Sequence, residues 1–211
     1  MSQRVIAWDF DGVLNRNIVD GRLIWKTNFS NDLGVSEDEF SNYMFRSGRF
    51  DDVLIGRRDV RDLVSDWLSQ STCQHSVDQI LDYWFSNDAL PDERTLEILN
   101  HASANGFQNV LATNNETRRV AYIENDMGFA NKVDHVFAAG RMGCKKPDPA
   151  FFENIEHTLQ VAAEEILLID DKAANVEAAK ALGWSAFHFR GGDYAGLSRA
   201  ISEHGVRSPK C

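Results

Sequence analysis

With 211 residues, the chain is long enough for one domain, or for a core domain that carries a modest insert. Hydrophobic residues make up 43% of it and charged residues 26%, which is ordinary for a soluble globular protein. The formal net charge of −10 disfavours DNA or RNA as a partner, because a polyanion binds to a basic surface. This charge does not exclude a small phosphate held in a local positive or metal-bearing pocket.

The sequence favours a cytoplasmic protein without a membrane partner. The first 14 residues contain only a strand-length apolar run, not the longer run of a signal peptide. No run is long enough to span a bilayer. The three cysteines, Cys73, Cys144 and Cys211, are widely spaced and indicate neither a disulfide framework nor a zinc cluster. The sequence leaves the oligomeric state open.

The first predicted element is a buried strand at Val5–Trp8, an apolar run that is followed by Asp9 and Asp11. Side chains alternate along an extended segment, so the two carboxylates can point the same way. Gly12 allows the chain to turn directly afterwards. Two like charges this close need a cation or a shared proton. For this segment alone, an acidic turn without catalytic function is the alternative.

Residues 24–85 have helical character and contain no convincing strand. Apolar residues at helical spacing predict helices at 24–33, 37–46 and 59–70, and another that follows Ser76. Ser36 and Glu39 form the pattern of a capping box at the start of the second of these helices. The apolar stripes are most simply the core of a small all-helical insert.

From residue 91 onward, predicted helices and strands alternate. The helices are expected at 91–106, 116–127, 147–159, 173–182 and 194–203. The strands are expected at 107–112, 133–139, 166–169 and 186–189. This alternation predicts an α/β fold, in which helices cover both faces of a mainly parallel sheet. We therefore divide the chain into an α/β core, residues 1–15 and 91–211, and a helical domain, residues 16–90.

Polar residues follow four of the predicted strands. They are Asp9 and Asp11, then Thr113, Asn114 and Asn115, then Lys145 and Lys146, and finally Asp170 and Asp171. Ligands of open parallel sheets bind beyond the carboxyl ends of the strands, so we expect these groups to meet at one edge. Each group alone is typical of an ordinary loop, turn or helix cap.

Four segments in this order resemble the motifs of the haloacid dehalogenase (HAD) superfamily of phosphohydrolases. They are residues 9–13, 111–114, 146–147 and 167–171, the last followed by 175–179. The resemblance covers nearly the whole chain and implies a Rossmann-like core. The helical insert is similar to the cap domain that this family places just after the first strand. Residues 45–48 and Gly56 also resemble the glucose-1-phosphate phosphatase branch.

The resemblance implies hydrolysis of a small phosphorylated metabolite, with a sugar phosphate as one candidate. Asp9 would be the nucleophile that forms an aspartyl-phosphate, and Asp11 would protonate the leaving oxygen and then activate water. Thr113 and Asn114 would hold the phosphoryl oxygens. Lys146 would offset negative charge, because the family's lysine directly precedes a proline.

The resemblance also implies a bound Mg²⁺ ion. Its ligands would be Asp9, the backbone carbonyl of Asp11, and Asp171, with Asp170 as a further candidate. Oxygen ligands of this kind suit Mg²⁺. Two residues depart from the family pattern: Lys172 follows the aspartate pair where a small residue is usual, and Asn175 stands where some members have an aspartate.

Three other functions are compatible with parts of this pattern. A phosphomutase shares all four motifs. A 2-haloacid dehalogenase uses the aspartate nucleophile but has no acid at the position of Asp11 and needs no metal, so Asp11 and Asp171 argue against it. A catalytically silent binding module is expected to have lost a motif residue, and none is missing here.

Overall fold

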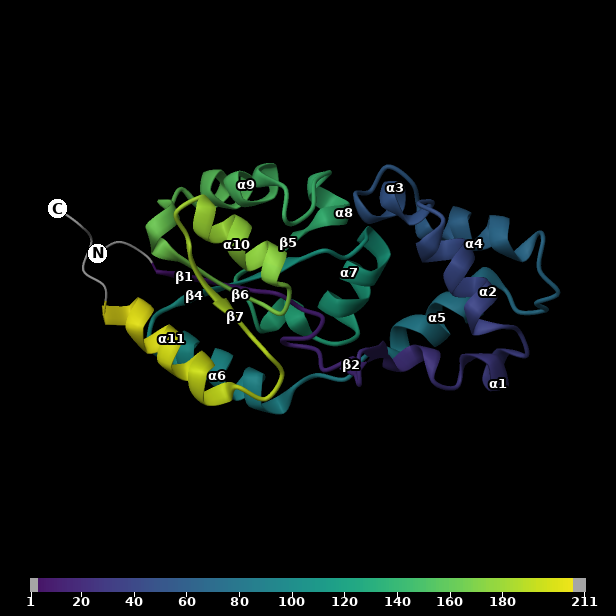
Figure 1. Cartoon of the computed structure of the whole chain (residues 1–211), viewed down its shortest axis with the longest axis horizontal. Coiled ribbons are helices and arrows are strands. Elements are labelled where there is room, and N and C mark those ends of the chain that lie inside the picture. Colours follow the sequence, from purple (N-terminus) through teal and green to yellow (C-terminus); the bar gives the residue numbers. More distant parts are fainter. Residues whose placement is uncertain (1–3, 207–211) are drawn as a thin grey trace.

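The computed structural model describes residues 4–206, so Cys211 lies outside the described residues. Figure 1 shows an α/β core beside a group of short helices, which is the predicted fold class. Cys73 and Cys144 are free thiols. No helix within the described residues combines the length and the apolar character that crossing a bilayer requires.

The core sheet, as far as the structure describes it, contains five strands that are all parallel. They are β1 (Val5–Trp8), β4 (Gln108–Thr113), β5 (His135–Ala138), β6 (Ile166–Asp170) and β7 (Ser185–His188). Their order is β5-β4-β1-β6-β7, with β1 at the centre. Strands that follow β1 in the sequence lie on both sides of it, and in open parallel sheets ligands bind beyond the carboxyl ends of the strands at such a point.

Helices cover both faces of the sheet because its central strand is apolar on both sides. Ile6 and Trp8 belong to a core cluster with residues of α6 and α11, whereas Val5 and Ala7 belong to one with residues of α9 and α10. Figure 1 shows these two helix pairs on opposite sides of the strands. The core helices are α6 (Glu93–Ala104), α7 (Thr117–Asn125), α8 (Ala139–Met142), α9 (Pro149–Leu159), α10 (Ala173–Ala181) and α11 (Tyr194–Val206), with short turns η3 (Phe129–Asn131) and η4 (Ala163–Glu165).

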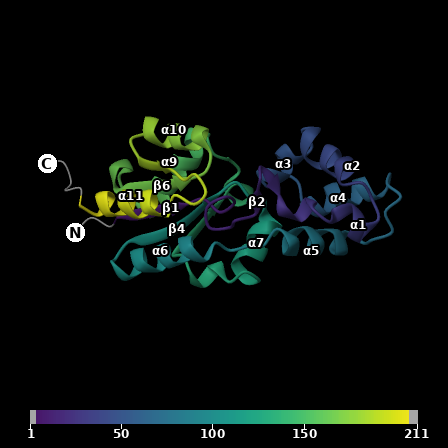
Figure 2. The ribbon, with the colours of Figure 1, turned by 60° about the horizontal axis from the view of Figure 1, so that its bottom comes forward.

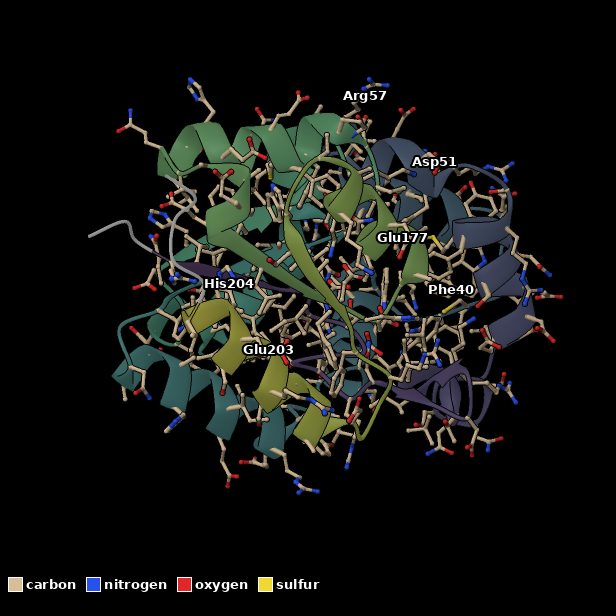
Figure 3. All side chains as sticks on the ribbon, turned by 60° about the vertical axis from the view of Figure 1, so that its left-hand side comes forward. Phe40, Asp51, Arg57, Glu177, Glu203 and His204 are labelled. Atoms are coloured by element: carbon tan, nitrogen blue, oxygen red, sulfur yellow. The ribbon has the colours of Figure 1, made fainter. Side chains whose placement is uncertain are left out.

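The helical insert has a hydrophobic core of its own, rich in aromatic rings. Phe40 and Trp67 pack edge to face with ring centroids 4.9 Å apart, and Trp25 contacts Phe40 and Trp84. Figure 3 labels Arg57 at the periphery of the molecule, where its side chain extends into solvent. The elements are η1 (Ile24–Lys26), α1 (Phe29–Leu33), α2 (Glu37–Ser41), a π-helical turn η2 (Asn42–Arg46), α3 (Phe50–Leu54), α4 (Val60–Leu68) and α5 (Val77–Asn87).

Two segments connect the core to the insert, and they lie side by side. The Arg16 N–H donates to the Leu90 carbonyl at 2.7 Å, and the Asp92 N–H donates to the Leu14 carbonyl at 2.9 Å. Figure 2 shows the insert beyond β2 and α7, at one end of the sheet. The departing and returning chains therefore form one junction between the two parts.

The structure differs from the prediction in several elements. A small hairpin, β2 (Ile18–Val19) and β3 (Arg22–Leu23), replaces the expected irregular segment. Its turn is Asp20-Gly21, with both φ angles positive, a sequence typical of tight hairpins. The expected helix start at Pro91 is wrong: α6 begins at Glu93, because the Asp92 carboxylate caps the N–H groups of the first turn. The short helices α3 and α8 were not predicted, since each is too brief to carry a helical pattern.

Candidate active site

The carboxyl ends of β1 and β6 and the turn before α9 bring three charged groups into contact. The Lys146 ammonium lies 3.1 Å from Asp9 Oδ1 and 2.5 Å from Asp170 Oδ2. All three side chains are buried. A buried ammonium between two carboxylates offsets their repulsion, so the arrangement needs each partner.

Asp9 is held at the end of β1 by its own backbone and by the next residue. Its N–H continues the sheet by donating to the Ile169 carbonyl, and Oδ1 accepts from the Phe10 N–H at 2.7 Å. Burial raises the pKa of the Asp9 carboxyl above its usual range, and Lys146 opposes this rise. A second cation beside Asp9 would favour the ionised form that a nucleophile needs.

Lys146 remains a cation in this environment. Burial lowers the pKa of its ammonium, but the attraction of Asp9 and Asp170 outweighs burial and the net shift is upward. Asp170 is held in turn by the Lys172 N–H at 2.8 Å and by the Asn175 amide, which lies 3.0 Å from each carboxylate oxygen. Both oxygens of Asp170 are therefore engaged by protein donors.

The residues at this site fit a divalent cation. Asp9, Asp170 and Asp171 each offer an oxygen, and the three atoms lie within 4.8 Å of one another. Asp171 Oδ1 is buried and has no hydrogen-bond partner among the described residues. A Cβ on Gly12 would lie 2.7 Å from Asp171 Oδ2, so a glycine at this turn lets the Asp171 carboxylate approach the chain beyond β1. Oxygen donors and an unpaired carboxylate oxygen suit Mg²⁺.

Asp11 is held by three side-chain amides. Its Oδ1 accepts from Asn17 at 2.8 Å and from Asn15 at 3.1 Å, and its Oδ2 accepts from Asn115 at 2.9 Å. The Asn115 amide also donates to Thr113 Oγ1 at 2.8 Å, which links the end of β4 to Asp11. The Asp11 carboxylate therefore has a defined orientation before any substrate binds.

The Asn114 side chain makes contacts other than those expected from the sequence. Its Oδ1 accepts from the Lys146 N–H at 2.9 Å, and its Nδ2 donates to the Lys146 carbonyl at 2.8 Å. These two bonds fix the backbone that carries the buried ammonium. The amide nitrogen carries a second hydrogen, so the phosphoryl contact expected of Asn114 stays a prediction.

Several residues that surround this site were not predicted from the sequence. Asn15 and Asn17 follow Asp11 in a polar segment, where an asparagine is ordinarily read as loop chemistry. Asn175 was noted only as a departure from the family pattern, yet its amide binds Asp170. Their spacing carries no recognisable pattern, because their contacts depend on how distant segments meet.

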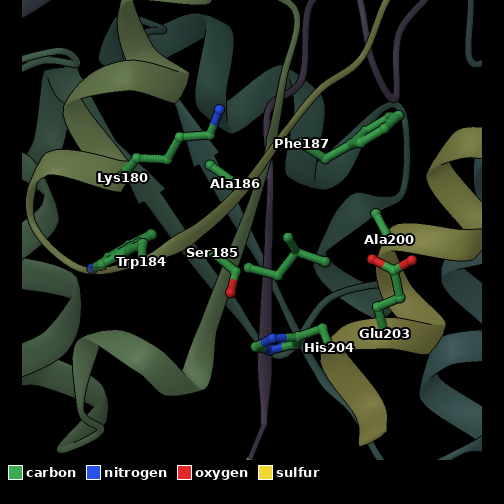
Figure 4. Close-up of a pocket in the computed structure, with 9 residues that line it drawn as sticks. Lys180, Trp184, Ser185, Ala186, Phe187, Ala200, Glu203 and His204 are labelled. Carbon is green, nitrogen blue, oxygen red and sulfur yellow. The ribbon is translucent and has the colours of Figure 1, made fainter. Parts of the chain in front are cut away.

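A pocket of about 320 Å³ lies elsewhere in the core, where the first residues of β7 meet α10 and α11. Figure 4 shows Lys180, Ser185, Glu203 and His204 around it. Its lining includes none of the site residues at the carboxyl ends of β1, β4 and β6. The polar groups that converge at the strand ends, rather than this hollow, define the candidate active site.

Comparison with known proteins identifies the family to which the chain belongs. The model of haloacid dehalogenase-like hydrolases matches residues 3–183, and the chain belongs to this family of hydrolases. The family resemblance drawn from the four motifs is therefore confirmed. The likeness to the glucose-1-phosphate phosphatase branch stays a prediction.

Two curated relatives carry phosphatase names. The chain is 31% identical over 104 residues to the sesquiterpene phosphatase astK of Aspergillus oryzae, which covers 46% of this chain and 50% of that protein. It is 28% identical over 194 residues to the phosphoglycolate phosphatase of Vibrio parahaemolyticus, which covers 87% of this chain and 82% of that protein. The chain thus spans half the length of the first relative and most of the second.

Solved structures share the fold. A HAD family enzyme of Bacteroides thetaiotaomicron, in complex with magnesium and inorganic phosphate, aligns with a TM-score of 0.74 and 19% identity over 90% of this chain and 96% of that one. A predicted HAD-like hydrolase of Porphyromonas gingivalis aligns with a TM-score of 0.77 and 20% identity, covering 99% of this chain and 100% of that one. At these identities the likeness shows the fold alone.

Proposed function

We propose that the protein is a Mg²⁺-dependent phosphomonoester hydrolase that acts through an aspartyl-phosphate. The observation that carries the proposal is the meeting of Asp9, Lys146 and Asp171 beyond the end of β1. Family membership and the two relatives named as phosphatases support it. A buried nucleophile, a fixed cation and a metal-binding carboxylate are what phosphoryl transfer requires.

In the first step, an oxygen of Asp9 attacks phosphorus and the bond from phosphorus to the leaving oxygen breaks. Asp11 gives its proton to that oxygen, so the alcohol leaves neutral. Lys146 and the Thr113 hydroxyl bind the phosphoryl oxygens, whose charge is spread in the transition state. The role of Asn114 is to hold the backbone of Lys146 in place.

In the second step, water attacks the phosphorus of the aspartyl-phosphate and frees Asp9 together with inorganic phosphate. Asp11, now ionised, accepts the proton of the attacking water. The same carboxylate therefore serves as acid and then as base. Its three amide contacts keep it in one place for both steps.

Asp9, Asp171 and the backbone carbonyl of Asp11 would hold the Mg²⁺ ion. When bound, the ion neutralises charge on the phosphoryl group and orients it toward Asp9. Asp171 is the stronger candidate of the aspartate pair because its Oδ1 has no hydrogen-bond partner within residues 4–206, whereas both oxygens of Asp170 do. Asp170 would then act on the site by holding Lys146.

Residues 16–90 would act as the cap that covers the bound substrate. The insert already contacts the core on the side of the site: Asp59 receives two 2.6 Å hydrogen bonds from Arg118, and Asp51 lies 3.1 Å from Lys145. A small phosphorylated metabolite suits a site closed in this way. A sugar phosphate is one candidate for it.

The proposal is tested by turnover of p-nitrophenyl phosphate. We expect activity that EDTA abolishes and Mg²⁺ restores, and a loss of at least about 10³-fold in Asp9→Asn. Asp126→Asn, an exposed aspartate at the end of α7, is the matched control and should keep wild-type activity. Equal turnover in EDTA, or retained turnover in Asp9→Asn, would exclude the proposed mechanism.

A further inference from the structure

We propose that Asn17 and Asp88 are positioning residues that couple the orientation of the Asp11 carboxylate to the docked position of the helical insert. The inference rests on the proposed role of Asp11 as the acid of the first step. Asn17 lies on the segment that leaves the core, and Asp88 follows the last helix of the insert. Together with Asn15 they connect Asp11 to the junction between the two parts of the chain.

One carboxamide touches both carboxylates. The Asn17 amide nitrogen donates to Asp11 Oδ1 at 2.8 Å and to Asp88 Oδ2 at 2.9 Å. Asn15 adds a second bridge: its amide nitrogen donates to Asp11 Oδ1 at 3.1 Å and to the Asp88 carbonyl at 2.8 Å. Asn15 Oδ1 also accepts from the Leu90 N–H at 2.7 Å. A shift of the returning segment would therefore pull on the amides that hold Asp11.

Arg119 of α7, a helix of the core, also binds the segment that ends at Asp88. The guanidinium donates to the Asp88 carbonyl at 3.1 Å, to Asp88 Oδ2 at 3.3 Å and to the Phe85 carbonyl at 2.7 Å. Arg119 is 2% exposed and Asp88 is 5% exposed. A buried charge pair persists only where its partners stay together, so this contact holds the end of α5 against the core.

The junction also contains polar atoms that packing alone does not explain. Asn17 Oδ1 and Asp88 Oδ1 are both buried and have no hydrogen-bond partner among the described residues. Unsatisfied buried oxygens are costly and uncommon in native proteins. Apolar side chains would fill this space without that cost, so a positioning role accounts for the polar residues here.

The experiment compares two substrates whose leaving groups differ in their need for an acid. Phenolate is more basic than p-nitrophenolate, so hydrolysis of phenyl phosphate depends more on the proton from Asp11. The value of kcat/KM reports the first chemical step, and the ratio of the two values is independent of the folded fraction of the sample. We expect Asn17→Ala and Asp88→Ala to lower kcat/KM for phenyl phosphate about tenfold more than for p-nitrophenyl phosphate.

Further variants separate positioning from a general structural effect. Asp11→Asn should change the ratio in the same direction and by more. Asp88→Asn keeps a carbonyl oxygen for the Asn17 amide, so its ratio should stay closer to that of the wild type. Asn28→Ala and Asn87→Ala, exposed residues of the insert, are the matched controls and should leave the ratio unchanged.

Equal losses on both substrates in Asn17→Ala and Asp88→Ala would overturn the inference, even with an active wild type. A wild type without Mg²⁺-dependent turnover would instead overturn the proposed function, and this inference with it. The two failures are distinguished by the wild-type activity alone.

Discussion

At the scale of single residues, the site depends on how cations and carboxylates are paired in a buried space. Lys146 pairs with Asp9 and Asp170 together, and the Asn175 amide lies 3.0 Å from each carboxylate oxygen of Asp170. Asp171 is arranged differently: Oδ2 accepts from Lys172, and Oδ1 has no hydrogen-bond partner in the part of the chain that the structure describes. Asp170 therefore has a structural role, whereas Asp171 is the candidate metal ligand.

Lys172 gives the first prediction, because its ammonium lies 2.6 Å from Asp171 Oδ2 while the side chain is 59% exposed. An exposed cation at a metal-binding carboxylate competes with the metal for negative charge. We expect Lys172→Met to tighten Mg²⁺ binding about two- to fivefold, the scale of an exposed ion pair, as measured by calorimetry. Lys180→Met, which removes an exposed pair with Glu177, is the control. An unchanged affinity in Lys172→Met would rule out this competition.

Sequence patterns captured the charged residues of the site better than the amides. The proximity of Asp9 and Asp171 could be predicted, because both follow buried strands whose carboxyl ends lie at the same edge of a parallel sheet. The contacts of Asn15 and Asn17 could not, because both residues contact Asp88, which lies far away in the chain. The contact between the Asn114 side chain and the backbone of Lys146 was likewise not predictable, because the two residues are far apart in the sequence.

At the scale of elements, the spacing of apolar residues and the positions of turn-forming residues were enough to place the strands and most helices. Apolar runs bounded by turn residues predicted β1 and β6 to within a residue. The β2–β3 hairpin was missed although its Asp20-Gly21 turn carries a recognised signal, because each strand has only two residues. The start of α6 is determined by the Asp92 side-chain cap rather than by Pro91.

Gly56 gives the second prediction, because the backbone of this insert residue lies close to the Gly140 carbonyl of the core. A Cβ at this position would lie 2.0 Å from the Gly140 carbonyl oxygen. We expect Gly56→Ala to push the insert off the core and to lower kcat/KM for p-nitrophenyl phosphate about tenfold or more, by the logic that a small misplacement is costly to catalysis. Steady-state kinetics on the purified variant measure this effect.

Gly34→Ala separates crowding from backbone strain. Both glycines have positive φ, +73° at Gly56 and +68° at Gly34, but no atom of the described residues outside the immediate neighbours lies within 4 Å of a Cβ at Gly34. Strain at a left-handed residue therefore affects both variants, whereas contact with the core affects one. Similar kinetic losses in the two variants would contradict a role for the Gly56–Gly140 contact.

The junction gives the third prediction, which concerns stability and pH. Burial and the nearby Asp11 raise the pKa of Asp88 to about 7, although Arg119 opposes the rise. Folded Asp88 therefore holds a proton at pH 5, where the unfolded chain has mostly lost it, so this residue stabilises the fold less as pH rises toward 7. Asp88→Asn has no such dependence.

We expect the free energy of unfolding of Asp88→Asn, relative to the wild type, to increase by about 2 kcal/mol between pH 5 and pH 8. Urea denaturation at several pH values in EDTA measures this difference, and EDTA keeps metal binding out of the comparison. Asp126→Asn, an exposed aspartate, should show a nearly constant difference. A constant difference for Asp88→Asn as well would show that Asp88 is ionised throughout.

At the scale of the whole molecule, strand order creates the site. Because β1 lies between β4 and β6, the ends of these three strands and the turn that follows α8 meet at one edge. Alternating helices and strands predicted a parallel sheet, and the motif order predicted which ends would converge. The docking of the insert through Asp59, Asp51 and Arg119 was not predictable, since ion pairs between distant segments leave no periodic pattern in a sequence.

The most direct test of the whole account is to locate the phosphoryl group on the protein. Asp11→Asn should slow release of phosphate while p-nitrophenyl phosphate still donates its phosphoryl group, because its leaving group needs little protonation. After mixing with Mg²⁺ and an acid quench, mass spectrometry should find one phosphoryl group on the peptide that contains Asp9. A phosphoryl group on another peptide, or one that persists when Asp9→Asn is added to this variant, would contradict the account.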